Sequence, residues 1–370
     1  MTTPHAVPTK IVLAGGGTGG HVTPALAIAD AIRAQYPATE ILFVGTPQGL
    51  EATLVPRRGY RIELVAGSRL VGGGLGSKVK GLQSLAAGIL AARRILAAER
   101  PNVVLGVGGY ASGAALLAAR SLGLPTAVHE SNAVPGLTNR VLGALVDRVY
   151  LGFEAAARDF PQEVSLLSGN PVRAEIAAVG AGRQLPQGRR VRVLVVGGSQ
   201  GSLFLNERVP HLLGLVAAAG VELEVRHQVG KLEAAPVEQR YAEAGLKVTV
   251  AGFIDDMAGA YAWADFAVTR SGSGTVSELA AAGLPALLVP FPHAAGDHQA
   301  ANAKAFVDAG AGAWVRQAKW QAPDLAEWIV GLFGDPTVWQ RTSDSARRLG
   351  ARDAARAIAL DCATWLEGGC

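Results

Sequence analysis

The segment Lys10–Leu26, KIVLAGGGTGGHVTPAL, is the clearest indication of fold class in this 370-residue chain. It opens with an aliphatic run, Lys10–Ala14, that predicts a buried strand, and passes into GGGTGG, where the backbone must turn tightly or approach a ligand. An Ala- and Leu-rich segment, Pro24–Gln35, follows and predicts a helix. A strand, a glycine turn and a helix in this order are typical of a doubly wound α/β sheet.

The same alternation runs through the rest of the chain. In the first half we expect strands at Lys10–Ala14, Glu40–Val44, Arg61–Val65, Asn102–Val107, Pro125–Glu130, Arg148–Leu151 and Val164–Leu167, with a further helix at Leu82–Ala98. The pattern restarts in the second half, with strands at Arg192–Val196, Glu222–His227, Lys247–Val250, Phe266–Thr269 and Pro285–Val289. Because the chain is longer than one core usually supports, we predict two successive α/β domains, each with a parallel sheet covered on both faces. The stretch Val179–Arg190 has the composition of a linker region.

The composition narrows the class of protein. The chain is 49% hydrophobic and 17% charged, which is typical of a globular protein. A net charge of +4 without a densely basic element indicates no nucleic-acid partner. Two cysteines near the C-terminus, Cys362 and Cys370, give no disulfide framework and favour a reducing compartment. The N-terminus does not have the pattern of a signal peptide, and no window offers the roughly 20 apolar residues of a spanning helix, so we expect a soluble or peripheral protein.

Four glycine-rich turns are the candidate ligand-binding segments. They are GGGTGG (Gly15–Gly20), GVGGYASG (Gly106–Gly113), GGSQGS (Gly197–Ser202) and RSGSGTVSE (Arg270–Glu278). Backbone N–H groups at a helix N-terminus attract phosphate, and ligands of open parallel sheets bind beyond the carboxyl ends of the strands. We therefore expect the four turns to cradle phosphate groups in a cleft between two facing sheets.

Two simpler interpretations of these turns stay open. Gly15, Gly17 and Gly20 satisfy the G-x-G-x-x-G pattern of a dinucleotide site, although the second strand ends in Gly45 and Thr46, where such a site needs an acidic residue. Thr275 and Glu278 have the spacing of a capping box, in a helix that would run to about Ala282. The first interpretation predicts an NAD-dependent oxidoreductase, and the second gives Glu278 a purely structural role.

Eight motifs in order resemble a known family over nearly the whole chain. They are GGGTGGHVTPAL (Gly15–Leu26), GVGGYASG, HESNAVPGLTNR (His129–Arg140), SGNPVR (Ser168–Arg173), GGSQGS, FIDDM (Phe253–Met257), RSGSGTVSELAAAGLPALLVPFP (Arg270–Pro292) and DHQAANA (Asp297–Ala303). Together they resemble the bacterial N-acetylglucosaminyltransferase family commonly called MurG.

The resemblance implies a fold, a reaction and a location. The fold is two Rossmann-like doubly wound domains facing a cleft, the GT-B type. We place an acceptor- and membrane-facing domain at residues 1–165, a UDP-sugar donor domain at 166–345, and a C-terminal helix at 346–370 that packs back on the first domain. The implied reaction is an inverting transfer of N-acetylglucosamine from UDP-N-acetylglucosamine to the C4 hydroxyl of the muramyl sugar of undecaprenyl-diphosphoryl-muramyl-pentapeptide. This is a step of cell-wall synthesis, and hence of cell shape and division, at the cytoplasmic face of the membrane, where other cell-wall synthesis proteins are possible partners.

The resemblance also implies donor-binding residues. Thr18, Gly19 and Gly20 approach the donor from the first turn, and Asn132 and Arg173 touch it as well. Ser199 meets the diphosphate, the backbone of Ile254 pairs with uracil, and Glu278 holds the ribose hydroxyls. Thr275 also binds the donor. Gln299 contacts the sugar. Because the segment between Phe291 and Gln299 departs from the family pattern, His298 is the alternative residue for this role.

The chemistry of transfer points to two catalytic candidates. His21 directly follows the first turn, and an imidazole is suited to abstract a proton near pH 7. Glu130 is the competing base, or the residue that orients the acceptor. The sequence contains no D-x-D pair to hold Mg²⁺, so we expect no metal and no cofactor, with helix N-termini and loop N–H groups stabilising the diphosphate.

A membrane contact is expected between Leu64 and Ala98, where no acidic residue occurs. Arg69, Lys78 and Lys80 can meet anionic inner-leaflet lipids, and Leu70, Val71, Leu75 and Val79 can enter the interface. Further along, Leu82, Leu85, Ile89 and Leu96 have helical spacing and are expected in the core. Alternatives to the MurG reaction are another GT-B UDP-sugar transferase and a UDP-sugar epimerase.

Overall fold

The computed structural model describes residues 10–17, 19–65, 75–185, 190–198, 200–350 and 353–367, without the side chains of residues 75–80, 82 and 364–367. The chain forms two compact units. Unit 1 comprises Met1–Arg173 and Arg352–Cys370, and unit 2 comprises Ala174–Ala351. The chain thus passes from unit 1 to unit 2 between Arg173 and Ala174, before the expected linker Val179–Arg190.

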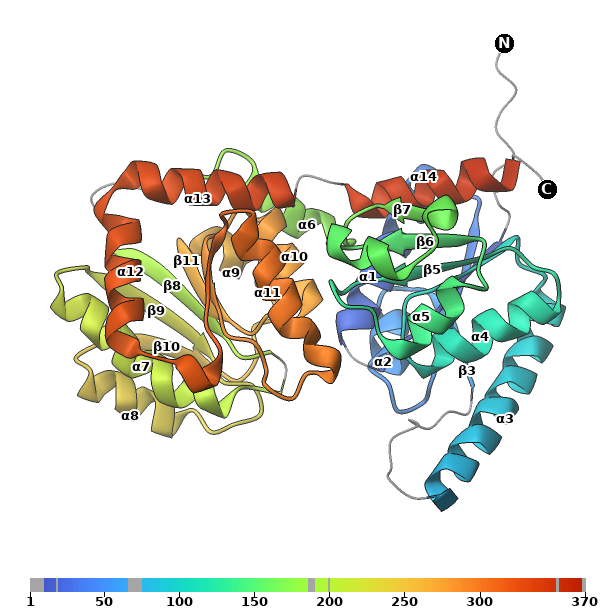
Figure 1. Cartoon of the computed structure of the whole chain (residues 1–370), viewed down its shortest axis with the longest axis horizontal. Helices are drawn as coiled ribbons and strands as arrows, with labels where there is room; N and C mark the ends of the chain where they lie inside the picture. Colours follow the sequence, from blue (N-terminus) through green and yellow to red (C-terminus); the bar gives the residue numbers. More distant parts are fainter. Residues whose placement is uncertain are drawn as a thin grey trace, which may run out of the picture. The chain divides into compact units, whose positions relative to one another are not determined.

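Unit 1 is built on a seven-stranded parallel sheet in the order β3-β2-β1-β4-β5-β6-β7 (Figure 1). Its strands are β1 (Lys10–Ala14), β2 (Glu40–Gly45), β3 (Arg61–Leu64), β4 (Val103–Gly106), β5 (Thr126–Glu130), β6 (Arg148–Leu151) and β7 (Ser165–Leu167). Its helices are α1 (Gly19–Gln35), α2 (Glu51–Arg57), α3 (Leu75–Glu99), α4 (Tyr110–Ser121), α5 (Leu137–Gly143) and α14 (Ala354–Glu367), with short 3₁₀ turns η1 (Glu154–Asp159) and η2 (Gln162–Val164).

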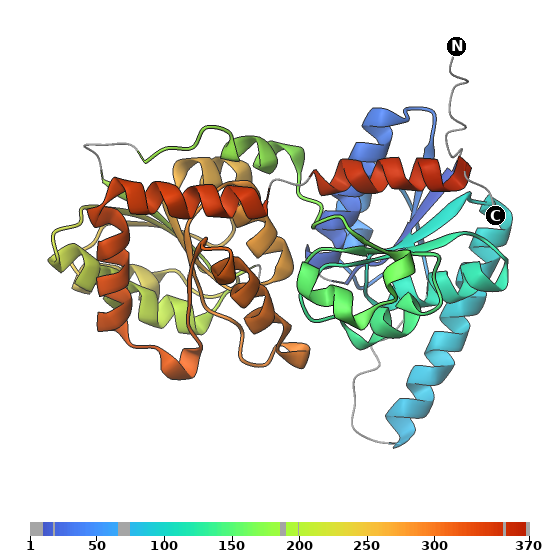
Figure 2. The same cartoon turned by 45° about the horizontal axis from the view of Figure 1, so that its top comes forward.

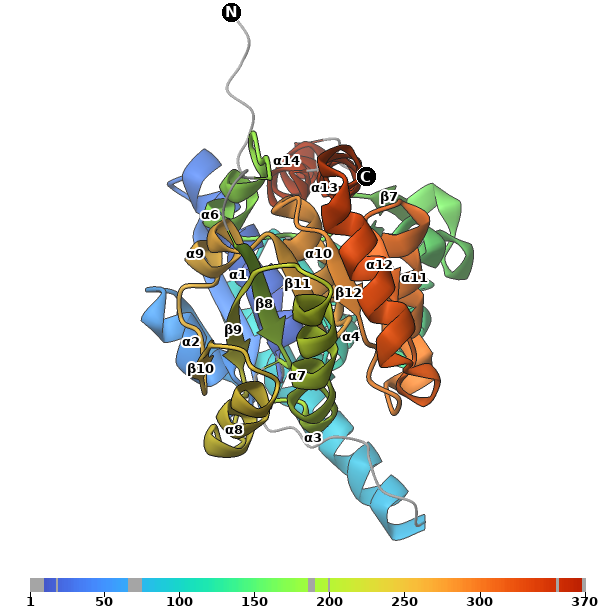
Figure 3. The ribbon, with the colours of Figure 1, turned by 90° about the vertical axis from the view of Figure 1, so that its left-hand side faces the viewer.

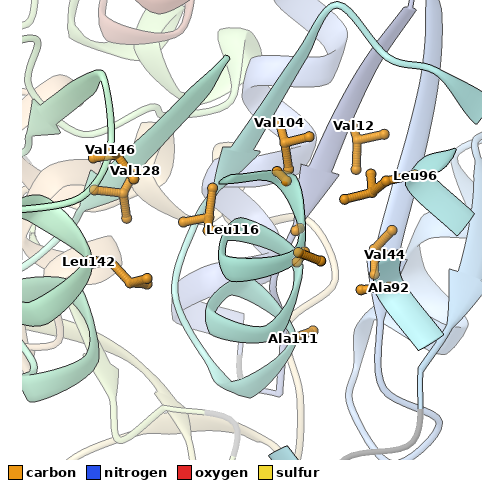
Figure 4. Packing of buried hydrophobic residues seen from close by; sticks show 14 of the residues in the cluster. Val12, Val44, Ala92, Leu96, Val104, Ala111, Leu116, Val128, Leu142 and Val146 are labelled. Atoms are coloured by element: carbon orange, nitrogen blue, oxygen red, sulfur yellow. The ribbon is translucent and has the colours of Figure 1, made fainter. Parts of the chain in front are cut away.

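Alternation along β1 creates the two cores of unit 1. Val12 and Ala14 face a buried cluster with α3 and α4 (Figure 4), whereas Ile11 and Leu13 face a second cluster with α1 and α14. Successive side chains of a strand point to opposite faces, so an all-apolar strand is what a sheet covered on both sides requires.

The C-terminal helix α14 belongs to unit 1 and packs against α1 (Figure 2). Its residues Ile358 and Cys362 are completely buried in the core that α14 shares with α1. The Asp361 carboxylate accepts a hydrogen bond from the Tyr150 hydroxyl at 2.9 Å and pairs with the Arg148 guanidinium at 3.0 Å. The last helix is therefore fixed to the sheet of unit 1 by apolar burial and by a pair of polar contacts.

Unit 2 repeats the design with a six-stranded parallel sheet in the order β10-β9-β8-β11-β12-β13. Its strands are β8 (Val191–Val196), β9 (Leu223–Gln228), β10 (Val248–Ala251), β11 (Phe266–Thr269), β12 (Ala286–Leu288) and β13 (Gly312–Trp314). Its α-helices are α6 (Ala174–Ala177), α7 (Leu203–Ala218), α8 (Ala235–Glu243), α9 (Met257–Trp263), α10 (Ser273–Ala281), α11 (His298–Asp308), α12 (Ala322–Gly334) and α13 (Pro336–Leu349); the 3₁₀ turns are η3 (Ala178–Gly180), η4 (Ala295–Asp297) and η5 (Gln317–Lys319). Helices α7 and α8 pack side by side (Figure 3), and with α12 they cover one apolar core.

The expected doubly wound α/β fold and all twelve expected strands are confirmed, within one or two residues at their ends. Helix α1 begins at Gly19, five residues before the expected start at Pro24. A proline near a helix start removes only one backbone donor, here the one that would reach the Gly20 carbonyl, so the helix extends back over the glycine turn. Strand β13, Gly312–Trp314, is not among the expected strands, because three residues are too few to show an apolar strand pattern.

Helix α3 also begins earlier than expected, at Leu75, and continues to Glu99. Of the four residues expected in the core, Leu96 is fully buried and Ile89 packs on the same cluster, so the prediction is confirmed for these two. Leu85 is half-buried, and the side chain of Leu82 lies outside the described part of the chain. Among the described residues, no helix is both long enough and apolar enough to cross a membrane.

A buried histidine makes the stability of unit 2 depend on pH. The His227 ring is fully buried, with Nδ1 at 3.0 Å from the Tyr241 hydroxyl and Nε2 at 3.0 Å from the Asn206 side-chain oxygen. Burial lowers the pKa of His227 from 6.5 to about 3. The unfolded chain therefore binds a proton below pH 6.5 that the folded chain does not bind.

We predict that acidification from pH 7 to pH 5 lowers the free energy of unfolding through His227 by about 2 kcal/mol. Chemical denaturation of wild type and His227→Gln at both pH values measures this contribution as the difference between their pH slopes. The variant should be less stable at pH 7 but less sensitive to acid. Equal slopes in the two proteins would show that His227 is not the proton-binding group.

Candidate functional site

The topology of unit 1 brings its two glycine turns together. The strand order reverses between β1 and β4, so the turn after β1 and the turn after β4 lie side by side at the carboxyl edge. The Gly16 N–H donates to the Gly108 carbonyl at 3.3 Å. A Cβ atom at Gly109 would lie 2.5 Å from the Gly16 carbonyl oxygen, and one at Gly15 would lie 2.6 Å from the Gly108 carbonyl oxygen. The glycines are thus required by the contact between the two turns.

A buried carboxylate supports the first turn. Glu51, the first residue of α2, is 1% exposed. Its Oε2 accepts from the Gly17 N–H at 2.7 Å, and its Oε1 accepts from the Thr46 N–H at 2.8 Å and the Thr46 hydroxyl at 2.9 Å. The acidic residue that the end of the second strand lacks in the sequence is thus supplied by Glu51, six residues after Gly45, whose side chain folds back to the strand end.

His21 lies in the first turn of α1, as its third residue, and is half-buried. It packs on the second glycine turn, where a Cβ atom at Gly108 would lie 2.6 Å from the His21 Nδ1. Burial lowers the pKa of the neighbouring His129 to about 4, and the charge of His21 adds to that shift. Gly19 and Gly20 are the first two residues of the same helix, and Thr18 lies outside the described residues.

Glu130, at the end of β5, is 1% exposed and organises the loop that follows it. Its Oε1 accepts from the Asn132 N–H at 2.8 Å and the Asn132 side-chain amide at 3.2 Å. Its Oε2 accepts from the Asn139 amide at 2.9 Å and the Gly136 N–H at 3.3 Å. Burial raises the pKa of Glu130, and these hydrogen bonds oppose the shift. Both carboxylate oxygens are therefore engaged within the loop.

The loop after β5 is tied to the segment that leads to Arg173. The Asn170 side-chain amide donates to the Ser131 carbonyl at 2.9 Å. Asn132 and Arg173, both expected at the donor, are half-buried and belong to unit 1.

In unit 2 the strand order reverses between β8 and β11, so the turns after these strands are again neighbours. Ser202 is the N-cap of α7 and its hydroxyl accepts from the Leu205 N–H at 3.3 Å. A Cβ atom at Gly201 would lie 2.1 Å from the Val229 carbonyl oxygen. Ser199, the expected diphosphate contact, lies outside the described residues.

One buried amide joins the first of these turns to the segment that carries Ile254. Gln228, at the end of β9, is 3% exposed. Its Nε2 donates to the Gly198 carbonyl at 3.2 Å, and its Oε1 accepts from the Ile254 N–H at 3.1 Å. Nothing in the sequence pattern marked Gln228, because a glutamine after an apolar strand has no characteristic spacing.

The capping-box interpretation of Thr275 and Glu278 is wrong. Helix α10 begins at Ser273 with Gly272 as its N-cap, so Thr275 is its third residue and not the cap. Glu278 is half-buried and accepts a hydrogen bond from the buried Tyr261 hydroxyl at 2.9 Å. The helix ends as predicted, with Ala282 as its C-cap and Gly283 in a left-handed conformation at φ 61°.

Gln299 and the second turn of unit 2 are linked. The Ser271 hydroxyl donates to the Gln299 carbonyl at 2.8 Å, and the Gln299 Oε1 accepts from the Phe291 N–H at 2.9 Å. The Nδ1 of its rival, His298, lies 2.7 Å from the Ala295 carbonyl oxygen.

A half-buried arginine, which no sequence pattern marks as functional, stands at the start of this turn. The Arg270 guanidinium donates to the carbonyls of Val289 and Pro290 at 3.1 and 3.2 Å. Burial lowers the pKa of Arg270 to about 10, so its cationic form persists at neutral pH. Arg270 therefore places a positive charge at the carboxyl edge of β11.

The expected membrane segment is only partly described. Leu70 and Val71 lie outside the described residues, and for Leu75, Lys78, Val79 and Lys80 the helical backbone alone is described.

Comparison with known proteins agrees with this geometry. Residues 11–151 match the glycosyltransferase family 28 N-terminal domain, and residues 192–358 match the glycosyltransferase family 28 C-terminal domain. The chain is similar to proteins named UDP-N-acetylglucosamine–N-acetylmuramyl-(pentapeptide) pyrophosphoryl-undecaprenol N-acetylglucosamine transferase. It is 44% identical to the one from Magnetococcus marinus, over 92% of this chain and 93% of that protein. It is 40% identical to the one from Geotalea daltonii, over 94% and 96%. Among solved structures it is similar to Acinetobacter baumannii MurG, with a TM-score of 0.78 and 30% identity over 95% of this chain and 98% of that one.

The bridge made by Gln228 yields a prediction for nucleotide binding. Gln228→Ala removes the side chain that holds the Gly198 and Ile254 segments together, so the affinity for UDP should fall on the order of tenfold. Isothermal titration of UDP into wild type and variant measures this change.

A matched control is Asn206→Leu, which removes another buried amide of unit 2, one whose side-chain oxygen bonds to the buried His227 ring. The control should bind UDP as wild type does. UDP affinity of Gln228→Ala within about twofold of wild type would contradict the assigned role.

Proposed function

The chain belongs to the MurG family of N-acetylglucosaminyltransferases within glycosyltransferase family 28, and from this premise we propose its reaction. It transfers N-acetylglucosamine from UDP-N-acetylglucosamine to the C4 hydroxyl of the muramyl sugar of undecaprenyl-diphosphoryl-muramyl-pentapeptide. The names of its full-length relatives support this assignment. The observation that carries it is the pairing of glycine turns at the reversal point of each sheet, where such folds bind nucleotides.

Unit 2 binds most of the donor in this proposal. Glu278 receives the ribose hydroxyls, and the Tyr261 hydroxyl orients its carboxylate. Because the Ile254 N–H donates to Gln228, its carbonyl is the backbone group suited to accept a hydrogen bond from N3–H of uracil. Ser199 is proposed for the diphosphate and Gln299 for the sugar, and Thr275 is a further donor contact. From unit 1 we propose that Thr18, Gly19, Gly20, Asn132 and Arg173 also contact the donor.

His21 is proposed as the general base. Its imidazole accepts the proton of the acceptor hydroxyl while the oxygen attacks C1 of the sugar from the face opposite the diphosphate. The bond between C1 and the β-phosphate oxygen breaks, UDP leaves, and the anomeric configuration inverts. Glu130, whose four hydrogen bonds hold its loop, fits the role of orienting the acceptor better than that of accepting its proton.

Stabilisation of the leaving diphosphate comes from backbone donors in this proposal. Turns at the N-termini of α7 and α10 supply N–H groups and the positive ends of two helices. A donor site of this kind does not need a divalent cation, in line with the lack of a D-x-D pair in the sequence.

The enzyme is further proposed to work as a peripheral protein at the cytoplasmic face of the membrane, because the acceptor's lipid tail stays in the bilayer. The expected contact is Leu70, Val71, Leu75, Lys78, Val79 and Lys80. Two exposed apolar side chains of α5, Leu137 and Val141, support an interfacial surface on unit 1; they are exposed by 79% and 57%, and Leu145, which follows the helix, is exposed by 44%. The spacing of four residues places Leu137 and Val141 on one face of the helix.

We predict that His21→Ala lowers turnover by about 10²- to 10⁴-fold, because proton transfer to a positioned base is lost. UDP affinity should change little. Transfer of radiolabelled sugar to a short-chain lipid acceptor measures turnover, and His211→Ala, at an exposed histidine of α7, is the control. Near-normal turnover of His21→Ala would exclude His21 as the base, and sugar interconversion by wild type without acceptor would favour an epimerase.

A second prediction concerns the membrane. Lys78→Glu/Lys80→Glu should bind anionic vesicles more weakly than wild type, because each lysine near a charged surface contributes about 1 kcal/mol. Sedimentation with vesicles of anionic and of neutral lipid measures the difference. Lys231→Glu/Lys247→Glu makes the same charge change at exposed positions of unit 2 and should bind like wild type. If the two double variants bind equally, the proposed contact is wrong.

A further inference from the structure

The first glycine turn already holds an anion, supplied by the protein itself. A glycine turn that leads into a helix N-terminus offers backbone N–H groups to a negatively charged ligand. Here the Gly17 N–H donates to the Glu51 carboxylate at 2.7 Å, and the other oxygen of that carboxylate is held by Thr46. The position that a phosphate oxygen occupies in a nucleotide-binding turn is taken by a side chain.

The fit around this carboxylate is tight. A Cβ atom at Gly16 would lie 2.0 Å from Glu51 Cδ, one at Gly45 would lie 2.4 Å from Cγ, and one at Gly49 would lie 2.0 Å from Oε2. Three glycines therefore make room for one side chain that is 1% exposed. The backbone of the turn is shaped around Glu51.

Two routes connect this carboxylate to His21. Along the chain, Gly17 lies two residues before Gly19, where α1 begins and in whose first turn His21 stands. Through space, Gly16 donates to the Gly108 carbonyl, and Gly108 packs against the His21 ring. A shift of the turn would move both the start of the helix and the surface on which the imidazole rests.

We propose that Glu51 is a positioning residue, an internal anion that holds the first glycine turn in the conformation that presents His21 to the acceptor hydroxyl. The Gly17 N–H is then part of the scaffold and does not bind a substrate phosphate. The link to catalysis rests on the proposed transferase function, whereas the link to the geometry of the turn does not.

The chemistry of the contacts offers a sharp variant. Glu51→Gln keeps the size and shape of the side chain. Both carboxylate oxygens accept hydrogen bonds, so an amide NH₂ in either position meets a donor. The substitution therefore breaks the hydrogen bonding of residue 51 either to Gly17 or to Thr46, without opening a cavity.

Asp265→Asn is the matched control. Asp265 is 3% exposed, accepts from the Arg192 N–H at 2.9 Å, and stands at the amino end of β11 in unit 2, away from the glycine turns. Like Glu51→Gln, the substitution Asp265→Asn replaces a buried carboxylate that accepts a backbone hydrogen bond by a neutral amide of the same shape.

The experiment has two arms. In the enzyme without substrates, amide hydrogen exchange of the peptide that spans Gly17 to His21 should be faster in Glu51→Gln than in wild type and in Asp265→Asn. In the transfer assay, kcat of Glu51→Gln should fall about 30-fold or more, with the KM for the donor within about threefold of wild type. A general loss of stability would instead affect both variants alike.

Three results would overturn the proposal. The first is amide hydrogen exchange of the Gly17–His21 peptide that is the same in Glu51→Gln as in wild type. The second is a kcat of Glu51→Gln no lower than that of Asp265→Asn. The third is a kcat of Glu51→Gln equal to that of wild type, with a substrate KM that rises tenfold or more. The last result would mean that the turn binds a substrate and does not position the base. If wild type transfers no sugar, the proposed function fails, and the exchange arm still decides whether Glu51 holds the turn.

Discussion

The close approach of two backbone turns, at the point where the sheet of unit 1 reverses its strand order, is the constraint on which the proposed site is built. In unit 1 a single Cβ atom at Gly15 or Gly109 would overlap the neighbouring turn. In unit 2 a glycine is required between the turns after β8 and β9, because a Cβ atom at Gly201 would lie 2.1 Å from the Val229 carbonyl oxygen. Glycine at these positions lets neighbouring turns, with their backbone N–H groups, approach at the carboxyl edge of each sheet.

The turns at the carboxyl edges of the two sheets are supported by side chains of different charge. A carboxylate, Glu51, stands inside the first turn of unit 1, and like-charge repulsion disfavours a diphosphate next to it. The side chain that ties the loops of unit 2 is the neutral amide of Gln228, and the cationic Arg270 stands at the same edge. Electrostatics thus supports the donor's phosphates on unit 2 and leaves unit 1 to orient the reacting groups.

Much of the fold was predictable from the sequence, because strands such as Lys10–Ala14 are continuous apolar runs between strong turn signals. The ends of helices were less predictable. Pro24 suggested a helix start that the structure places at Gly19, and Thr275 suggested a cap that Gly272 provides. Glu51 and Gln228 could not be identified at all, because each acts by folding back on a segment distant in sequence, Glu51 on Gly17 and Gln228 on Ile254. Local patterns report secondary structure and turns, whereas such supporting contacts are created by the tertiary fold.

Calorimetric titration of UDP-N-acetylglucosamine, with Mg²⁺ and with a chelator in its place, is the most direct test of the central claim that glycine turns and helix ends hold the nucleotide. If backbone donors of unit 2 carry the diphosphate, the donor binds at one site with the same affinity, within about twofold, in both conditions. An absence of binding heat, or binding that disappears with the chelator, would contradict the account.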